Sequence, residues 1–154
     1  MTVEIKKTVP VRVAQAEGSA AEPGMAALGP VFAALLPKVE AVITASGGKP
    51  GTSVGYYEMP GEGVVVHAGY EIGDLALKPD AEVTAVDLPV VEVASLLHRG
   101  TMASLADGYQ QLMDWIDASD YAPVAPSREL YLEWHAPDSP DNVTELQMPV
   151  ARKA

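Results

Sequence analysis

The sequence predicts an α+β fold made of two copies of one strand-helix-strand-strand unit. A Val-Pro motif carries the first sign: residues 9–14 read Val-Pro-Val-Arg-Val-Ala, and residues 88–94 read Leu-Pro-Val-Val-Glu-Val-Ala. Each copy precedes an apolar pattern with helical spacing and two alternating stretches, the last of which are residues 64–72 and 143–150. This order predicts an antiparallel sheet with two helices packed on one face. A duplication also predicts a pseudo-two-fold axis with a ligand cleft at the seam.

The spacing of the two copies defines the expected domain organisation. Pro10 and Pro89 are 79 residues apart. We therefore expect residues 1–154 to form a single domain, with repeat 1 at about residues 1–73 and repeat 2 at about residues 82–150. A chain of 154 residues is long enough to bury one hydrophobic core.

In the first half, residues 3–16 have the alternation of a strand. Residues 28–43 have the spacing of an amphipathic helix, and Pro37 is expected to kink or split it. Residues 53–58 and 64–72 are typical of a hairpin.

The second half repeats this order after a linker at residues 73–81. Its expected elements are a strand at 82–97, a helix capped by Thr101, a loop at 121–127, a hairpin of 128–134 and 143–150, and a frayed tail at 151–154.

The strand at residues 127–134 has two different faces, because side chains alternate along a strand. One face carries Leu130, Leu132 and Trp134, and we expect it to pack on the helices. The other carries Ser127, Glu129, Tyr131 and Glu133.

The hairpins of the two halves align when their first serines are matched. The aligned pairs are Ser53 with Ser127, Gly55 with Glu129, Tyr57 with Tyr131, and, on the last strands, His67 with Glu145. This alignment predicts a seam that holds the Glu129 carboxylate, faces the space left by Gly55, and is lined by Tyr57 and Tyr131.

A partly buried carboxylate without a protein partner is costly, by several kcal/mol when ionised. It is therefore protonated, paired, or available to a cationic ligand, and each cation–π contact with a nearby aromatic ring adds roughly 0.5–2 kcal/mol. The alternative is that Glu129 pairs with Arg128 or faces water. On the second helix, Tyr109 and Trp115 are core residues or ligand-wall residues. On the strands, Glu133 and Glu145 are solvated residues or ligand contacts, and His67, which aligns with Glu145, is a candidate ligand contact.

Four stretches together resemble the GyrI-like small-molecule-binding domains, the effector-binding domains of AraC-type and MerR-type regulators. They are the opening Val-Pro strand, residues 100–116 ending in Met-Asp-Trp-Ile, residues 127–132 (Ser-Arg-Glu-Leu-Tyr-Leu) and residues 144–150 (Thr-Glu-Leu-Gln-Met-Pro-Val). The resemblance covers nearly the whole chain and implies duplicated SHS2 units with a ligand cleft between them. It implies that Glu129 contacts cationic drugs and that Tyr57, Tyr109, Trp115 and Tyr131 form walls.

Three functions follow from this resemblance and the aromatic carboxylate face. The leading one is a standalone, cytoplasmic protein that binds hydrophobic, often cationic, small molecules for sequestration or sensing. The second is a hydrolase of electrophilic, cyclopropane-bearing compounds, with Glu129 as general base. The third is a protein-interaction module, such as a gyrase modulator.

Composition excludes several other classes. The net charge of −11 does not suit nucleic-acid binding, and there is no cysteine. His67, His98 and His135 lack metal-ligand spacing, and no cofactor motif is present. No signal peptide is visible, and there is no run of about 18 apolar residues, so we expect a cytoplasmic protein that does not enter a membrane.

Overall fold

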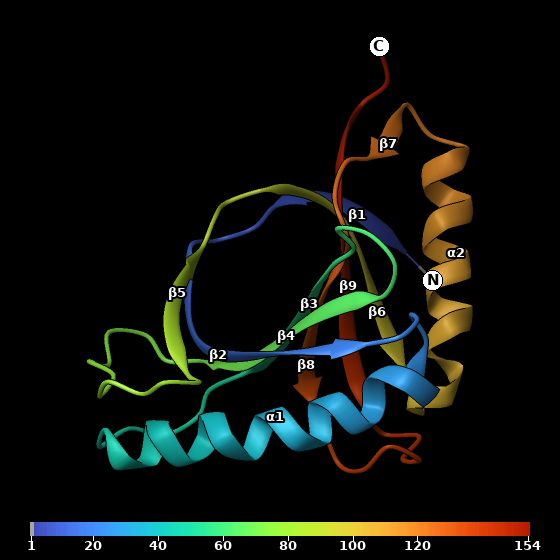
Figure 1. The fold of residues 1–154 in the computed structure, drawn as a ribbon. Coiled ribbons are helices and arrows are strands. Elements are labelled where there is room, and N and C mark those ends of the chain that lie inside the picture. The colour runs from blue at the N-terminus through green and yellow to red at the C-terminus, as the bar shows by residue number, and fades with distance from the viewer. Residues whose placement is uncertain (1) are drawn as a thin grey trace. The chain divides into compact units, whose positions relative to one another are not determined.

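The computed structural model describes residues 2–154. Contacts divide the chain into two compact units. The first unit is Val9–Pro89, and the second unit is Val90–Ala154 together with the chain up to Thr8. Within the described residues there are nine strands, two α-helices and one short 3₁₀ helix, and every strand pair inside a unit is antiparallel (Figure 1). The predicted α+β class is therefore confirmed.

The first unit is a four-stranded sheet with one helix. Its elements are β2 (Val11–Ala20), α1 (Met25–Ala45), β3 (Ser53–Glu58), β4 (Val64–Glu71) and β5 (Thr84–Leu88), and its strand order is β3-β4-β2-β5. The β3–β4 hairpin matches the prediction. The strand predicted at residues 3–16 is wrong in its bounds, because β2 starts at Val11 and runs on to Ala20.

Helix α1 packs on β2 and β4 through one apolar stripe. Its buried residues are Leu28, Phe32, Leu35, Val39 and Ile43, which join the core of the first unit. The spacing of three and four residues places them on one face. The helix runs through Pro37 without being split.

The part of α1 at Ala26–Ala45 is long and apolar enough to cross a membrane, judged by length and composition alone. The core helix of a water-soluble protein passes the same test. Lys38 and Glu40 interrupt the apolar run, which is why the sequence pattern does not predict a span. In the structure, the apolar stripe of this helix forms part of the core of the first unit.

The second unit has the same plan. Its elements are β1 (Val3–Lys7), β6 (Glu92–Arg99), the 3₁₀ helix η1 (Met102–Ser104), α2 (Leu105–Asp117), β7 (Tyr121–Pro123), β8 (Arg128–Glu133) and β9 (Val143–Arg152). The strand order is β1-β6-β9-β8, and β7 pairs with the end of β9. Two predictions are corrected here: the loop at 121–127 contains β7, and Arg152 of the predicted tail pairs with Tyr121.

The two units exchange their outer strands. Strand β1 precedes the first unit in the sequence but pairs with β6, and β5 precedes β6 but pairs with β2. The chain passes from the strands of one unit to those of the other near Pro10 and at Pro89. Proline has no backbone N–H to donate to a ladder, so it favours a strand end at these points. This explains why the single strands predicted at 3–16 and 82–97 are each two strands.

The strand registers also correct the alignment of the copies. On β4 and β9, Ala68 and Leu146 are equivalent, and their partners on β2 and β6 are Ala16 and Leu96. Along the sequence, Ala16 and Leu96 are 80 residues apart, whereas Pro10 and Pro89 of the Val-Pro motif are 79 residues apart. The motif therefore identifies the duplication but not its register.

Candidate functional site

Glu129 is almost fully buried in the second unit, with 3% of its surface exposed. The Tyr131 hydroxyl donates a hydrogen bond to Glu129 Oε1 at 2.7 Å. The Tyr109 hydroxyl donates to Glu129 Oε2 and also lies 2.9 Å from Ser127 Oγ. Both carboxylate oxygens are therefore held by phenol groups. The prediction of an acid unmatched within the protein is wrong, and so is the alternative that Glu129 faces water.

Two elements bring these groups together. Glu129 and Tyr131 are two residues apart on β8 and so share a face. Tyr109 lies on α2, whose buried residues Leu105 and Leu112 seat the helix on the sheet. The helix-facing side of β8 is therefore the Glu129 side.

The opposite assignment, that Leu130, Leu132 and Trp134 pack on the helices, is wrong. Leu132 and Trp134 are 48% and 49% exposed. A β-bulge explains the loss of alternation: Tyr131 pairs with Thr144 and Glu133 pairs with Val143, which leaves Leu132 as an extra residue.

Trp134 contributes to the surroundings of the cluster from the end of β8. Its ring meets the Tyr131 ring edge to face, with the centroids 6.1 Å apart. The alternation of side chains along residues 127–134 predicts a helix contact for Trp134 and gives no sign of this position. Trp115, on α2, is 37% exposed, and its role as a ligand wall stays a prediction.

The first-unit equivalents of Glu129 and Tyr131, which are Gly55 and Tyr57, are also buried or nearly so in their own unit. Gly55 is buried and pairs with Ala68. Tyr57 joins the core of that unit and meets Phe32 of α1 edge to face, at a centroid distance of 6.2 Å. The part of Gly55 and Tyr57 in a ligand site shared with Glu129 stays a prediction.

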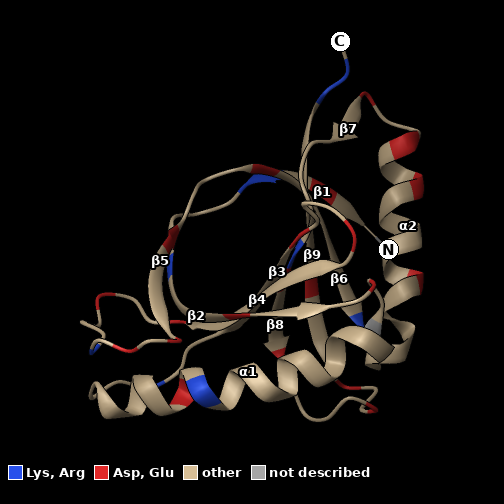
Figure 2. Cartoon of the chain, viewed as in Figure 1, with Lys and Arg blue, Asp and Glu red and all other residues tan. Residues whose placement is uncertain are grey.

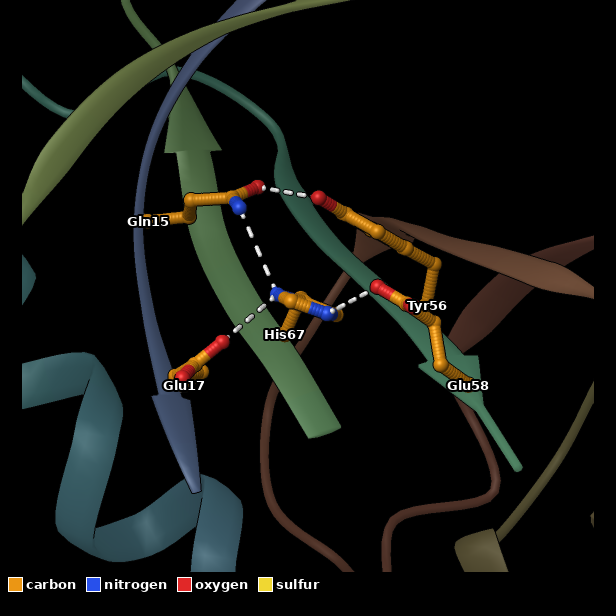
Figure 3. A network of polar contacts seen from close by, with 5 residues as sticks. All are labelled: Gln15, Glu17, Tyr56, Glu58 and His67. Carbon is orange, nitrogen blue, oxygen red and sulfur yellow. Dashed lines mark hydrogen bonds and ion pairs between the residues drawn. The ribbon is translucent and has the colours of Figure 1, made fainter. Parts of the chain in front are cut away.

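His67 belongs to a polar network on the first-unit face that does not carry the α1 core (Figure 3). Its Nε2 lies 2.7 Å from Glu58 Oε1, its Nδ1 lies 3.4 Å from Gln15 Nε2, and its ring stacks on Tyr56 at 4.5 Å. The Tyr56 hydroxyl donates to Gln15 Oε1 at 2.8 Å. Glu17 adds a more distant carboxylate, at 3.9 Å from Nδ1.

Glu145 is the equivalent of His67 in the second unit, and it is also buried. Lys6 Nζ lies 2.9 Å from Glu145 Oε2, and Ser95 and Gln147 donate to the same oxygen at 2.9 Å and 2.7 Å. Burial raises the pKa of Glu145, but the hydrogen bonds from Gln147, Lys6 and Ser95 and the charge of Lys6 outweigh it, so its pKa lies below the ordinary value. The alternative of a solvated Glu145 is therefore wrong, and the roles of Glu145 and His67 as ligand contacts stay predictions.

Lys6 could not be found from the sequence as a partner of Glu145. It lies on β1, at the opposite end of the chain, and it reaches Glu145 only because β1 pairs with β6. Across residues 2–154, no three His, Cys, Asp or Glu side chains are grouped so that they could hold a metal ion.

The chain is an α+β protein with a buried, hydrogen-bonded carboxylate cluster in its second unit. The model of the GyrI-like small-molecule-binding domain matches residues 1–151, so the chain belongs to this family. Among curated proteins, none matches the sequence.

Several solved structures share the fold. The C-terminal domain of EcmrR has a TM-score of 0.78 at 17% identity, with 99% of this chain and 98% of that chain covered. In the structure of EcmrR in complex with DNA, the match to this protein covers 58% of the EcmrR chain. SAV2435 bound to tetraphenylphosphonium has a TM-score of 0.65 at 14% identity, with 98% and 94% covered. A hydrolase from Listeria innocua has a TM-score of 0.66 at 11% identity, with 97% and 91% covered.

Proposed function

We propose that this chain binds lipophilic organic cations at the cluster of Glu129, Tyr109, Tyr131 and Ser127, and that it serves to sequester or sense them. The observation that carries the proposal is the buried Glu129 carboxylate held by two tyrosine hydroxyls. Membership of a small-molecule-binding family supports a ligand-binding role.

The chemistry of the cluster favours a cation. An ionised carboxylate attracts a positive charge, and the two phenols hold that of Glu129 in one orientation. The adjacent tyrosine and tryptophan rings favour a flat or aromatic cation, because cation–π contacts strengthen out of water.

The charge of the chain acts in the same direction. With a net charge of −11, the protein attracts cations from solution at low ionic strength. Helix α2, which carries Tyr109, has Asp107, Asp114 and Asp117 but no Lys or Arg (Figure 2).

Binding needs only the charge and the aromatic surface that the cluster provides. Hydrolysis would also need a group positioned at the scissile bond, so the geometry supports binding more directly than turnover. The tetraphenylphosphonium ion seen with SAV2435 offers a suitable probe.

The test is isothermal titration of tetraphenylphosphonium into wild type, Glu129→Gln and Glu133→Gln. Glu133 is on the same strand and exposed, so it serves as the matched control. We expect Glu129→Gln to weaken binding by about tenfold or more, equivalent to at least ~1.4 kcal/mol, and Glu133→Gln to change it little. Equal affinities of wild type and Glu129→Gln would reject the proposal, and mass spectrometry of an electrophilic ligand after incubation would reveal turnover.

A further inference from the structure

The middle of α2 approaches the sheet more closely than a side chain would allow. A Cβ atom at Gly108 would lie 2.8 Å from His98 Nδ1, 3.2 Å from His98 Cγ and 3.3 Å from Leu146 Cδ1. Real Cβ atoms essentially never approach another atom to less than 3.0 Å. Glycine is unfavourable inside a helix, so its presence here indicates a packing requirement.

The imidazole of His98 cannot easily move aside. The Ser104 hydroxyl donates its one proton to the Thr101 carbonyl at 2.8 Å. At 2.9 Å from Ser104 Oγ, His98 Nε2 must therefore be the donor. Nδ1, on the other side of the ring, points toward Gly108 and has no hydrogen-bond partner among the described residues.

The helix is also held at both ends. At the start, Thr101 Oγ1 accepts a hydrogen bond from the Ser104 N–H, which caps η1. At the end, Lys153 Nζ donates to the carbonyls of Asp117 and Ser119 at 3.3 Å and 2.9 Å. A Cβ at position 108 would therefore lift the middle of α2, where Tyr109 is the next residue.

We propose that Gly108 and His98 form a positioning pair that sets the height of α2 over the sheet, so that the Tyr109 hydroxyl reaches Glu129. The close contact at Gly108 brings Tyr109 to the carboxylate, and the bond fixes the orientation of that carboxylate for a ligand. This inference rests on the proposed function for its effect on ligand affinity, but the positioning itself is a property of the ligand-free protein.

The first experiment uses the ligand-free protein with ¹³C-labelled tyrosine ring carbons. Loss of a signal in Tyr109→Phe assigns the Tyr109 resonance. We expect Gly108→Ala to shift this resonance toward its position in Glu129→Gln. The double variant His98→Ala/Gly108→Ala, which removes the opposing ring, should return it to the wild-type position.

Gly29→Ala is the matched control. Gly29 also lies inside a helix, α1, and a Cβ there would meet nothing within 4 Å. The Tyr109 resonance should stay unchanged in this variant. A folded Gly108→Ala protein with an unshifted Tyr109 resonance would overturn the proposal. If Gly108→Ala does not fold, the double variant decides: a wild-type Tyr109 signal supports the proposal, and a shifted signal or an unfolded protein overturns it.

The second experiment measures tetraphenylphosphonium binding. Gly108→Ala should weaken it about tenfold, and in a Tyr109→Phe background the same substitution should have no further effect. An equal loss in both backgrounds would show a general disturbance of the helix and overturn the proposal. If wild type does not bind this cation, the proposed function fails, while the resonance of Tyr109 still tests the positioning pair.

Discussion

The two units place different chemistry at equivalent strand positions. On the helix-facing side, the second unit has Glu129, held by Tyr109 and Tyr131. The first unit has the buried Gly55 at the equivalent position, and Tyr57, two residues on, belongs to its hydrophobic core. The strand registers are matched, since Gly55 pairs with Ala68 and Glu129 pairs with Leu146. The comparison teaches that the same strand position carries a buried glycine in one copy of the unit and a buried, hydrogen-bonded carboxylate in the other.

The opposite faces differ less. His67 in the first unit and Glu145 in the second are both buried and hydrogen-bonded. The partner of His67, Glu58, comes from the adjacent strand β3, whereas Glu145 draws Lys6 from the exchanged strand β1. An equivalent position can therefore keep its polarity while its partners change.

The largest effect on the free energy of unfolding is expected at Gly69, whose equivalent in the second unit is Gln147. A Cβ at Gly69 would lie 1.9 Å from the Ala14 carbonyl oxygen, whereas the second unit accommodates a glutamine. We expect Gly69→Ala to lower the free energy of unfolding by about 3 kcal/mol, because backbone must move. Urea denaturation measures this, with Gly61→Ala, where a Cβ meets nothing, as control. Similar free energies of unfolding for Gly69→Ala and Gly61→Ala would contradict the close approach of the Ala14 carbonyl to Gly69.

A smaller effect is expected for Glu145→Gln. The folded pKa of Glu145 lies below its value of 4.5 in the unfolded chain, so its stabilisation is complete above that pH and is lost as pH falls through the folded pKa. At pH 7 we expect a loss of about 1 kcal/mol in the free energy of unfolding, and a smaller loss at a pH below 4.5.

Urea denaturation of wild type and variant at both pH values measures this change. Glu58→Gln, in the exposed part of the His67 network, is the control from the first unit. A Glu145→Gln loss that does not depend on pH would contradict the role of the buried carboxylate charge.

The smallest effect is expected at the β8 bulge, which the β3–β4 ladder lacks. Leu132→Ser should change the free energy of unfolding by less than about 0.5 kcal/mol, because the side chain is nearly half exposed. A loss above about 1.5 kcal/mol would mean that Leu132 packs inside, as unbroken alternation predicts.

Much of the local structure followed from periodicity. The β3–β4 and β8–β9 hairpins and both helices were predicted because the two-residue and 3.6-residue patterns are local properties. The residues of the cluster were also named from the sequence, since Glu129 and Tyr131 share a strand face. The hydrogen-bond partners of Glu129 could not be predicted. The bulge at Leu132 and the close packing of α2 on the sheet at Gly108 both depend on contacts between residues far apart in the sequence.

The sequence by itself determined that this protein is a duplication of one α+β unit with a carboxylate in one copy where the other has glycine. These properties depend on residue order and side-chain alternation alone. Only the tertiary structure decided that β1 and β5 exchange units, that Lys6 reaches Glu145, and that Glu129 faces α2. Strand pairing across the chain and close helix packing bring together groups far apart in sequence, and no local pattern records such contacts.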